Sequence, residues 1–231
     1  MVLWRKEWSV ATMKDAIFVS SWSGGKDSAM AFFRALQLGM KPQKILTMFE
    51  EDGELSKSHA LPPNVVEAQA ARLGVPLMMK EASWGTYEKQ FIEAMDECRA
   101  AGITHGVFGD IDIADHLTWV QTTCAKSDII PVHPLWQQSR RSVVEELLDN
   151  GFEAWIVVVN TSMMSSKYVG QRFTKEIVEE LEAAGIDACG ENGEFHTVVV
   201  DGPIFSERVP VLIGEPVEKG NYVFTLVSLA N

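Results

Sequence analysis

Short apolar runs alternate along this chain with longer segments in which apolar residues recur at helical spacing. The apolar runs lie at residues 16–19, 44–49, 76–80, 105–109 and 154–159 and predict strands. The helical segments cover residues 29–38, 64–73, 87–101, 142–150 and 174–184. Several of them end at a glycine such as Gly74, which is typical of helix C-termini. This alternation predicts a Rossmann-like α/β fold, with a mostly parallel sheet and helices on both faces.

The pattern changes after residue 159. A polar loop and one more helix lead to three β-like runs, at residues 198–200, 209–213 and 222–229. We therefore expect a smaller C-terminal α+β lobe behind the α/β part. The expected division is an N-terminal extension at residues 1–14, an α/β domain at 15–140 and a C-terminal lobe at 141–231.

Composition limits the class of protein. A chain of 231 residues, of which 46% are apolar, can bury a full core. No apolar run approaches the length of a membrane span, and the first residues lack the apolar core of a secretory signal, so we expect a cytoplasmic protein without membrane contact. Cys98, Cys124 and Cys189 form no CxxC pair, which argues against a zinc knuckle or a disulfide framework.

The formal net charge of −12 argues against a broad nucleic-acid surface, because phosphate binding needs an excess of Lys and Arg. We therefore expect no nucleic-acid partner. A local basic patch stays open, and its candidates are Lys57, Arg140, Arg141, Lys167 and Arg172. The apolar, β-rich C-terminal end is compatible with a homodimer.

A short polar motif joins the first predicted strand to the first predicted helix. Its residues are Ser23, Gly24, Gly25, Lys26, Asp27 and Ser28. The glycines allow the backbone to approach a ligand closely, and the helix that follows presents unpaired N–H groups to an anion. Lys26 adds a positive charge and the two serines add hydroxyl groups. Because neither GxxxxGKS/T nor GxGxxG spacing is present, the motif predicts a phosphate site of another kind.

A second polar motif covers residues 189–197. It contains Gly190, Glu191, Asn192, Gly193, Glu194, His196 and Thr197. Two carboxylates, an amide and an imidazole at this spacing could hold a polar substrate, a metal or a reacting amine, or could form an acidic hairpin with His196 packed in a strand. A structural zinc site would need more Cys or His, whereas Mg²⁺ shared between carboxylates and ATP phosphates suits a phosphate site.

One further carboxylate follows a predicted strand. The strand at residues 105–109 ends in Gly109, and Asp110 comes next. Ligands of open parallel sheets bind beyond the carboxyl ends of the strands, so we expect Asp110 to face the same crevice as the Ser23–Ser28 loop. Asp112 and Asp115 are expected to be ordinary loop residues.

Both motifs resemble those of a known family. The first resembles the SGGxDS signature of the PP-loop ATP pyrophosphatases, whose fold is of the HUP type. The second, together with residues 201–205 (DGPIF), resembles the CGENGEYHT and DGPxF signature of the diphthine–ammonia ligase family. The resemblance extends from about Asp15 to Val211 and includes Ser58-His59 and residues 134–136. The segment at 109–116 lacks the arginine-containing SDYQRxRVE sequence of eukaryotic ligases.

The resemblance implies an ATP-dependent ligase that adenylates a carboxylate, releases pyrophosphate and amidates the acyl-adenylate with ammonia. It implies ATP and Mg²⁺ as cofactors, with Asp27 as the Mg²⁺ ligand, and diphthine on an elongation factor as the acceptor if the source is eukaryotic or archaeal. The implied ATP-binding residues are Ser23, Gly24, Gly25, Lys26, Asp27, Ser28, Phe49, Gly109 and Asp110. The implied substrate-binding residues are His59, Gly190, Glu191, Asn192, Gly193, Glu194, His196 and Thr197. The implied catalytic residues are Lys26, Asp27, Glu191, Glu194 and His196.

Two other functions stay open at this point. The first is a PP-loop enzyme that acts on tRNA or on another small acid, although the isolated cysteines and the acidic charge weigh against thiolation of tRNA. The second is a sensor that binds ATP or AMP without turnover. Release of AMP and pyrophosphate would separate a ligase from a sensor.

Overall fold

The computed structural model describes residues 10–230 of the chain. Of the expected N-terminal extension, residues 1–9, with Trp4 and Trp8, lie outside that range, and α1 (Val10–Met13) is a single turn. The division into domains at residues 15–140 and 141–231 stays a prediction. Within the described part of the chain, no helix is long and apolar enough to cross a membrane.

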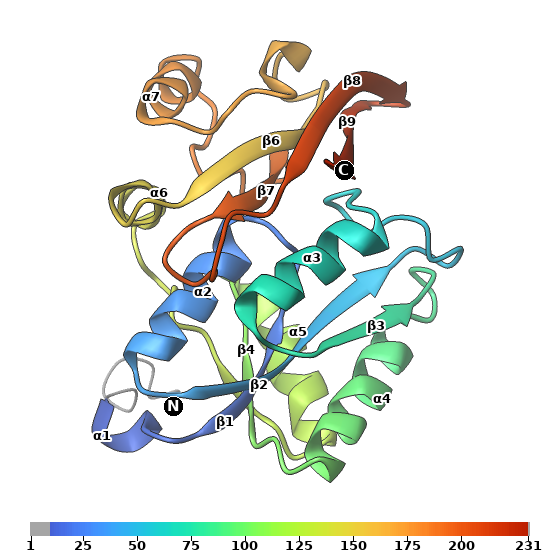
Figure 1. Ribbon diagram of the computed structural model, residues 1–231, viewed down its shortest axis with the longest axis vertical. Helices are drawn as coiled ribbons and strands as arrows, with labels where there is room; N and C mark the ends of the chain where they lie inside the picture. The colour runs from blue at the N-terminus through green and yellow to red at the C-terminus, as the bar shows by residue number, and fades with distance from the viewer. Residues whose placement is uncertain (1–9, 231) are drawn as a thin grey trace.

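Five parallel strands form the first sheet, in the order β3-β2-β1-β4-β5 (Figure 1). The strands are β1 (Ile17–Ser21), β2 (Lys41–Phe49), β3 (Leu77–Glu81), β4 (His105–Val107) and β5 (Ile130–Val132). The connecting helices are α2 (Lys26–Gln37), α3 (Pro63–Leu73), α4 (Tyr87–Ala100) and α5 (Ala114–Lys126). The predicted Rossmann-like α/β fold is confirmed.

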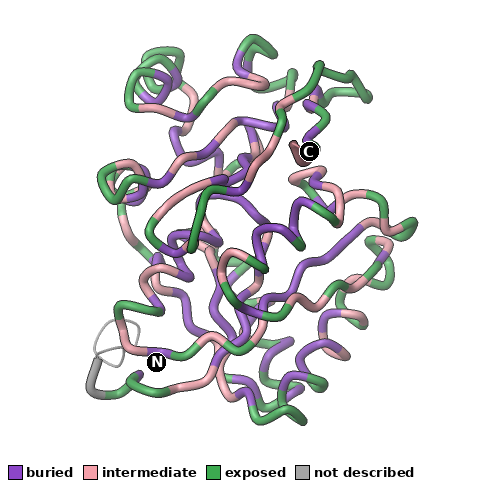
Figure 2. The backbone as a smooth tube through the Cα atoms, viewed as in Figure 1, coloured by how far each residue is buried: buried purple, intermediate pink, exposed green. Residues whose placement is uncertain are grey.

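The alternation of side chains along the strands gives this sheet two apolar faces. Phe18 and Ile45 belong to the core that includes α2 and α3, whereas their neighbours Val19 and Leu46 belong to the core beneath α4 and α5. Successive residues of a strand point to opposite faces, so a run that is apolar at every position predicts a sheet covered on both sides. Figure 2 shows the buried backbone along these strands.

Helix α5 and strand β5 were not predicted from the sequence. The apolar face of α5 is narrow, and its buried residues are Leu117, Val120, Thr123 and Cys124. Thr118, Thr122 and Thr123 have low helix propensity, and each hydroxyl donates to the carbonyl four residues earlier. Tertiary packing on the sheet therefore stabilises a helix that local preference disfavours.

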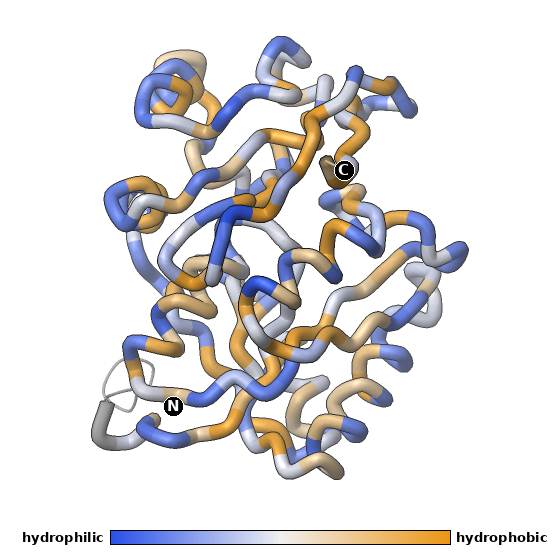
Figure 3. The backbone as a smooth tube through the Cα atoms, in the orientation of Figure 1, coloured by the Kyte–Doolittle hydropathy of each residue, from blue (hydrophilic) through white to orange (hydrophobic). Residues whose placement is uncertain are grey.

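The second sheet is antiparallel and has the order β7-β6-β9-β8. Its strands are β6 (Glu153–Asn160), β7 (Phe195–Asp201), β8 (Val211–Lys219) and β9 (Tyr222–Leu229). The helices of this part are α6 (Arg140–Asp149), the 3₁₀ turn η1 (Ser166–Tyr168) and α7 (Lys175–Ala183). The strands β6 and β7 are largely hydrophobic, and the helices outside them carry many hydrophilic residues (Figure 3). The predicted C-terminal α+β lobe is confirmed.

Strand β7 joins the two sheets through the loop between β1 and α2. The N–H of Val199 donates to the carbonyl of Gly24 at 2.8 Å, and the N–H of Lys26 donates to the Thr197 hydroxyl at 3.1 Å. Gln69 of α3 is fully buried and completes the junction. Its amide nitrogen donates to the carbonyls of Gly24 (3.1 Å) and Val199 (2.8 Å), and its oxygen accepts from the Trp22 indole at 3.0 Å.

We expect the substitution Gln69→Ala to reduce the free energy of unfolding by about 3 kcal/mol, because it leaves buried partners without hydrogen bonds and opens a cavity. Urea unfolding measures this loss. Gln37→Ala, on the exposed side of α2, is the matched control and should cost no more than about 0.5 kcal/mol. Equal losses in the two variants would contradict the role of Gln69.

Candidate active site

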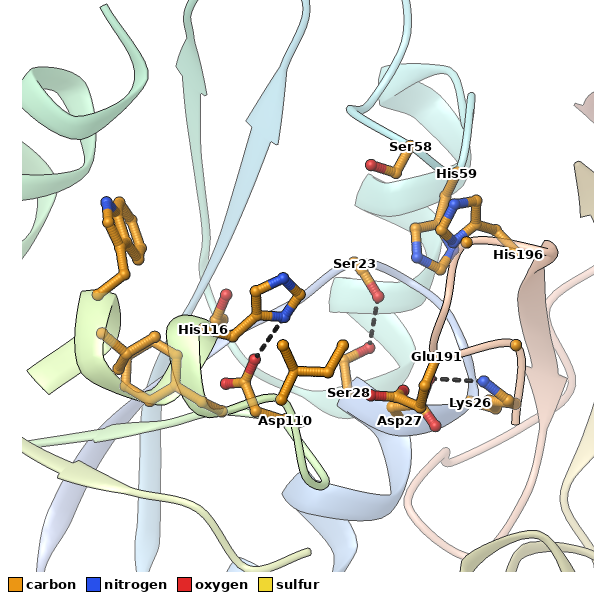
Figure 4. A pocket seen from close by; sticks show the side chains of 18 of the residues that line it. Ser23, Lys26, Asp27, Ser28, Ser58, His59, Asp110, His116, Glu191 and His196 are labelled. Carbon is orange, nitrogen blue, oxygen red and sulfur yellow. Dashed lines mark hydrogen bonds and ion pairs between the residues drawn. The ribbon is translucent and has the colours of Figure 1, made fainter. Parts of the chain in front are cut away.

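A cavity of about 960 Å³ opens at the carboxyl end of the parallel sheet, where the second motif lies across from the first. Its lining comes from the β1–α2 loop, residues 58–59, the end of β4, the N-terminal halves of α4 and α5, and residues 190–193 and 195–197. In Figure 4, Lys26, Asp27 and Glu191 lie together. His59 and His196 lie beside one another, and Asp110 with His116 lies on the other side of Ser23 and Ser28. The tertiary structure therefore brings the two motifs into one site.

The β1–α2 loop requires its two glycines. Gly24 has φ +81°, and a Cβ atom there would lie 2.6 Å from Leu61 Cδ1. A Cβ atom on Gly25 would lie 2.3 Å from His59 Cε1. Helix α2 begins at Lys26, directly after this turn, so its N-terminus faces the cavity beside the Ser23 and Ser28 hydroxyls, which lie 3.1 Å apart. Such a turn is suited to bind phosphate.

Lys26 and Asp27 form a buried ion pair in this turn, with Lys26 Nζ 2.6 Å from Asp27 Oδ2. Burial disfavours the Lys26 ammonium, but Asp27 and Glu191 outweigh that effect and raise the pKa of Lys26. Asp27 Oδ1 is buried and has no hydrogen-bond partner within the described residues. Burial, followed by repulsion from Asp27, raises the pKa of Glu191 to about 8. Glu191 therefore titrates near neutral pH.

His59 and His196 lie side by side, with ring centroids 4.7 Å apart and ring planes tilted by 46°. His59 Nδ1 lies 2.8 Å from the carbonyl of Thr197, which can only accept, so Nδ1 carries the proton and Nε2 keeps its lone pair. Burial lowers the pKa of His59 to about 4 and lowers that of His196 well below its usual range. Ser58 (φ +65°) and Ala60 (φ +52°) flank His59 in strained backbone, which holds its ring against Gly25.

Asp110 lies at the end of β4, between His116 Nδ1 at 3.6 Å and His133 Nε2 at 3.4 Å. Burial opposes its ionisation, but the hydrogen bonds of the two histidines outweigh that effect and lower the pKa of Asp110 to about 2. Asp110 is therefore a fixed negative charge at neutral pH. It is a cavity-lining residue, as Gly109 is.

An aromatic wall closes the cavity beyond Asp110. Its residues are Trp84, Tyr87, Phe91, Phe108 and Trp119. Neighbouring rings contact one another, with centroids 5.9 Å apart for Trp84 and Tyr87 and 5.7 Å apart for Tyr87 and Trp119. Trp84 is 73% exposed, and Lys57 Nζ lies 4.7 Å from its ring centroid. Such a wall suits a flat ring system.

Most of the predicted site residues line this cavity. They are Ser23, Lys26, Asp27, Ser28, His59, Gly109, Asp110, Gly190, Glu191, Asn192, Gly193, His196 and Thr197. Gly24 and Gly25 shape the loop from behind. The structure places two predicted residues elsewhere. Phe49 is 1% exposed and packs in the core under α2 and α3, and the Glu194 carboxylate accepts from the backbone N–H (3.0 Å) and side-chain amide (2.9 Å) of Asn192.

The five candidates for a local basic patch all lie beside carboxylates in the structure. Each of them forms an ion pair with a carboxylate: Lys57 with Glu50, Arg140 with Asp112 and Asp187, Arg141 with Glu145 and Glu182, Lys167 with Glu180, and Arg172 with Glu153. Residues far apart in sequence supply most of these acids. Sequence reasoning could not assign these pairs.

Sequence reasoning also missed several site residues. Tyr87, Trp119 and His116 come from the helices that follow β3 and β4, where a site at the carboxyl end of the sheet was already expected. The helix period gave Tyr87 the same pattern as core residues, and Trp119 and His116 lie in α5, which was not predicted. The signal that could have identified these residues is their position near the start of a helix that follows a parallel strand.

Comparison with known proteins supplies an independent finding. The family model of the diphthamide synthase N-terminal domain matches residues 13–131, more than half of the chain, and that of the diphthamide synthase C-terminal domain matches residues 139–227. A diphthine–ammonia ligase of Rattus norvegicus is 20% identical over 220 residues, which are 84% of this chain and 82% of that protein.

Two further relatives bear the same name. The diphthine–ammonia ligase of Schizosaccharomyces pombe is 22% identical over 219 residues, which are 85% of this chain and 36% of that protein. The Homo sapiens protein is 26% identical over 96 residues, 40% of this chain and 36% of that protein. The chain therefore spans only about a third of the length of these two relatives in the matched regions.

The lowered pKa of His59 predicts a pH effect on stability. Between its ordinary value of 6.5 and about 4, the unfolded chain binds a proton that the folded chain does not, so stability should fall as pH decreases through this window. The contribution is at most about 3 kcal/mol. Urea unfolding at several pH values should show a weaker pH dependence in His59→Gln. His116→Gln, which removes a histidine of raised pKa, should not weaken it. An unchanged slope in His59→Gln would contradict a neutral His59.

Proposed function

Because the chain belongs to the diphthamide synthase family, we propose that it is an ATP-dependent ligase that converts a carboxylate into an amide with ammonia. The carboxylate attacks the α-phosphate of ATP, which forms an acyl-adenylate and releases pyrophosphate. Ammonia then attacks the acyl carbon, the bond to the AMP oxygen breaks, and the amide and AMP leave. Relatives named diphthine–ammonia ligase make a diphthine-type acceptor the first candidate.

One observation carries this proposal: a phosphate-type turn and a cluster of proton-accepting side chains share one cavity. The turn supplies the α2 N-terminus, Lys26 and two hydroxyls. Glu191 lies beside Lys26 and Asp27 of the turn, and His59 and His196 line the same cavity. A nucleotide-binding protein without turnover would need only the phosphate-type turn, whereas two-step amidation needs both the turn and the proton-accepting side chains.

The turn has the chemistry that adenylation requires. Charge develops on the departing pyrophosphate, and preorganised N–H groups with a buried ammonium stabilise that charge in a site that excludes water. Lys26 is 5% exposed and its raised pKa keeps it charged. With the phosphates on the turn, the adenine ring reaches the aromatic wall, where it stacks on Tyr87 and Trp119, and Asp110 accepts from a ribose hydroxyl.

Magnesium fits this site through one protein ligand. No group of three or more His, Cys, Asp or Glu side chains suited to a metal occurs among residues 10–230. Asp27 Oδ1, buried and without a hydrogen-bond partner in the described chain, is a suitable single ligand, and ATP phosphates and water would complete the shell. When bound, Mg²⁺ would neutralise phosphate charge during the transfer.

The part of the cavity that is lined by His59, His196 and Glu191 suits amidation. Ammonia must attack as the free base, and the nitrogen must lose a proton as the C–N bond forms. The His59 and His196 rings are neutral, so lone pairs on their nitrogens accept N–H groups of the nucleophile. Glu191, whose pKa is raised to about 8, exchanges its proton near neutral pH, and its ionised form takes the proton from the nitrogen.

Turnover products test the proposed function. The protein is incubated with ATP, Mg²⁺, ¹⁵N-ammonium and an elongation factor that carries diphthine, and AMP, pyrophosphate and ¹⁵N-amide are quantified. We expect the three products in equal amounts. ADP as product, or bound ATP without turnover, would contradict the ligase. AMP and pyrophosphate formed only with a different acid would retain the ligase and replace the acceptor.

We expect Lys26→Ala to lower ATP-dependent pyrophosphate release by about 100-fold or more, because the variant loses the buried charge that stabilises the leaving group. Lys41→Ala is the matched control. Lys41 is exposed, pairs with Asp15 and lies outside the cavity lining, so this variant should retain the parent rate. Parent turnover in a folded Lys26→Ala protein would exclude the turn from phosphate binding.

A further inference from the structure

Arg140, the first residue of α6, connects two loops that meet at the cavity. Its guanidinium forms a bidentate pair with Asp112, at 2.8 and 2.7 Å, in the segment after β4. The same group donates to Asp187 Oδ2 at 2.7 Å, in the segment before the second motif. Arg140 is not among the residues that line the cavity. Its guanidinium also donates to the cavity-lining Asn192 at 3.5 Å, so any effect of Arg140 on chemistry must pass through the residues that it contacts.

Asp187 carries the connection into the second motif. Its Oδ2 atom accepts the backbone N–H of Glu191 at 2.9 Å, and its Oδ1 atom accepts that of Cys189 at 3.1 Å. Cys189 Sγ in turn donates to the Arg140 carbonyl at 3.2 Å. The side chain and the carbonyl of Arg140 thus hold the same turn at two points.

The turn needs such external restraint. Gly190 has φ +67° and Gly193 has φ +86°, on either side of Glu191 and Asn192. Glycine adopts such positive φ angles freely, so the backbone of this turn is adaptable. Asp187 has only 13% of its side chain exposed. If Arg140 were absent, this carboxylate would be nearly buried without its charge partner, which is costly enough to move the turn.

We propose that Arg140 and Asp187 are positioning residues that hold the turn bearing Glu191 in place at the cavity. They touch neither substrate nor reacting atoms. A bidentate guanidinium suits this task because its planar fork fixes Asp112 and leaves a further N–H for Asp187. The inference rests on the proposed function, because Glu191 acts there in the amidation step.

A double-mutant cycle on the full chain tests the proposal. Arg140→Gln, Asp187→Asn, Glu191→Gln and the Arg140→Gln/Glu191→Gln pair are compared for ¹⁵N-amide formation and for ATP–pyrophosphate exchange without ammonium. We expect Arg140→Gln to lower kcat for amide formation by about 10- to 100-fold, with the KM for ATP and the exchange rate within about twofold of the parent. In the Glu191→Gln background, Arg140→Gln should add no more than about twofold.

Two variants serve as controls. Arg141→Gln removes the neighbouring arginine, whose partners Glu145 and Glu182 lie on the helix surface, and should retain the parent rate. Arg140→Lys keeps the charge without the fork and should recover part of the loss. Additive losses in the cycle, an equal loss of exchange, or a parent rate in Arg140→Gln would each overturn the proposal.

Amide hydrogen exchange gives a readout that does not depend on turnover. Exchange at the N–H groups of Cys189 and Glu191, which donate to Asp187, should accelerate about 10-fold or more in Arg140→Gln and Asp187→Asn, with β7 unchanged. Unchanged exchange at these two groups would overturn the positioning role. If the parent protein makes no amide, the proposed function fails. The amide hydrogen exchange data alone then decide whether Arg140 and Asp187 position the turn.

Discussion

The hydrogen bonds between β7 and the β1–α2 loop are the constraint on which the site depends. Val199 donates to Gly24, and Thr197 accepts the N–H of Lys26, the first residue of α2. These bonds fix the loop backbone, and His196, which directly precedes Thr197 in β7, lines the cavity. A second connection supports them, because Arg34 of α2 donates to the carbonyl of Pro134 and pairs with Glu146 of α6. The two sheets therefore meet as one site.

The electrostatics of the cavity divide its carboxylates into two kinds. Hydrogen bonds from histidines lower the pKa of Asp110, whereas burial and Asp27 raise that of Glu191. Pairs of acids whose environments move their pKa values apart are typical of sites in which one acid provides charge and the other exchanges a proton. In the proposed function, Asp110 faces the nucleotide and Glu191 serves the nucleophile. Arg140 connects the two segments that carry these acids, since its partner Asp187 precedes Glu191 and its partner Asp112 follows Asp110.

The loops of the site combine free and restrained backbone. Gly24 and Gly25 allow close approach, and Gly190 and Gly193 allow a tight turn, but each pair is held by side chains from elsewhere. Gln69 and Thr197 restrain the first pair, and Asp187 and Glu194 restrain the second. Glu194 was expected to be catalytic, yet both of its oxygens bind Asn192 within the turn. A carboxylate used in this way stabilises the turn.

The sequence by itself determined what depends on local pattern. The strand–turn–helix at Ser23–Ser28, the α/β alternation and the second motif were predicted because backbone periodicity and glycine positions are properties of neighbouring residues. The tertiary structure decided what depends on residues far apart: the burial of Phe49, the acid partner of each candidate in the basic patch, the aromatic wall, and the approach of Glu191 to Lys26. Such contacts arise from packing and desolvation between different segments, some as far apart in sequence as Lys26 and Thr197, and local preferences carry no record of them.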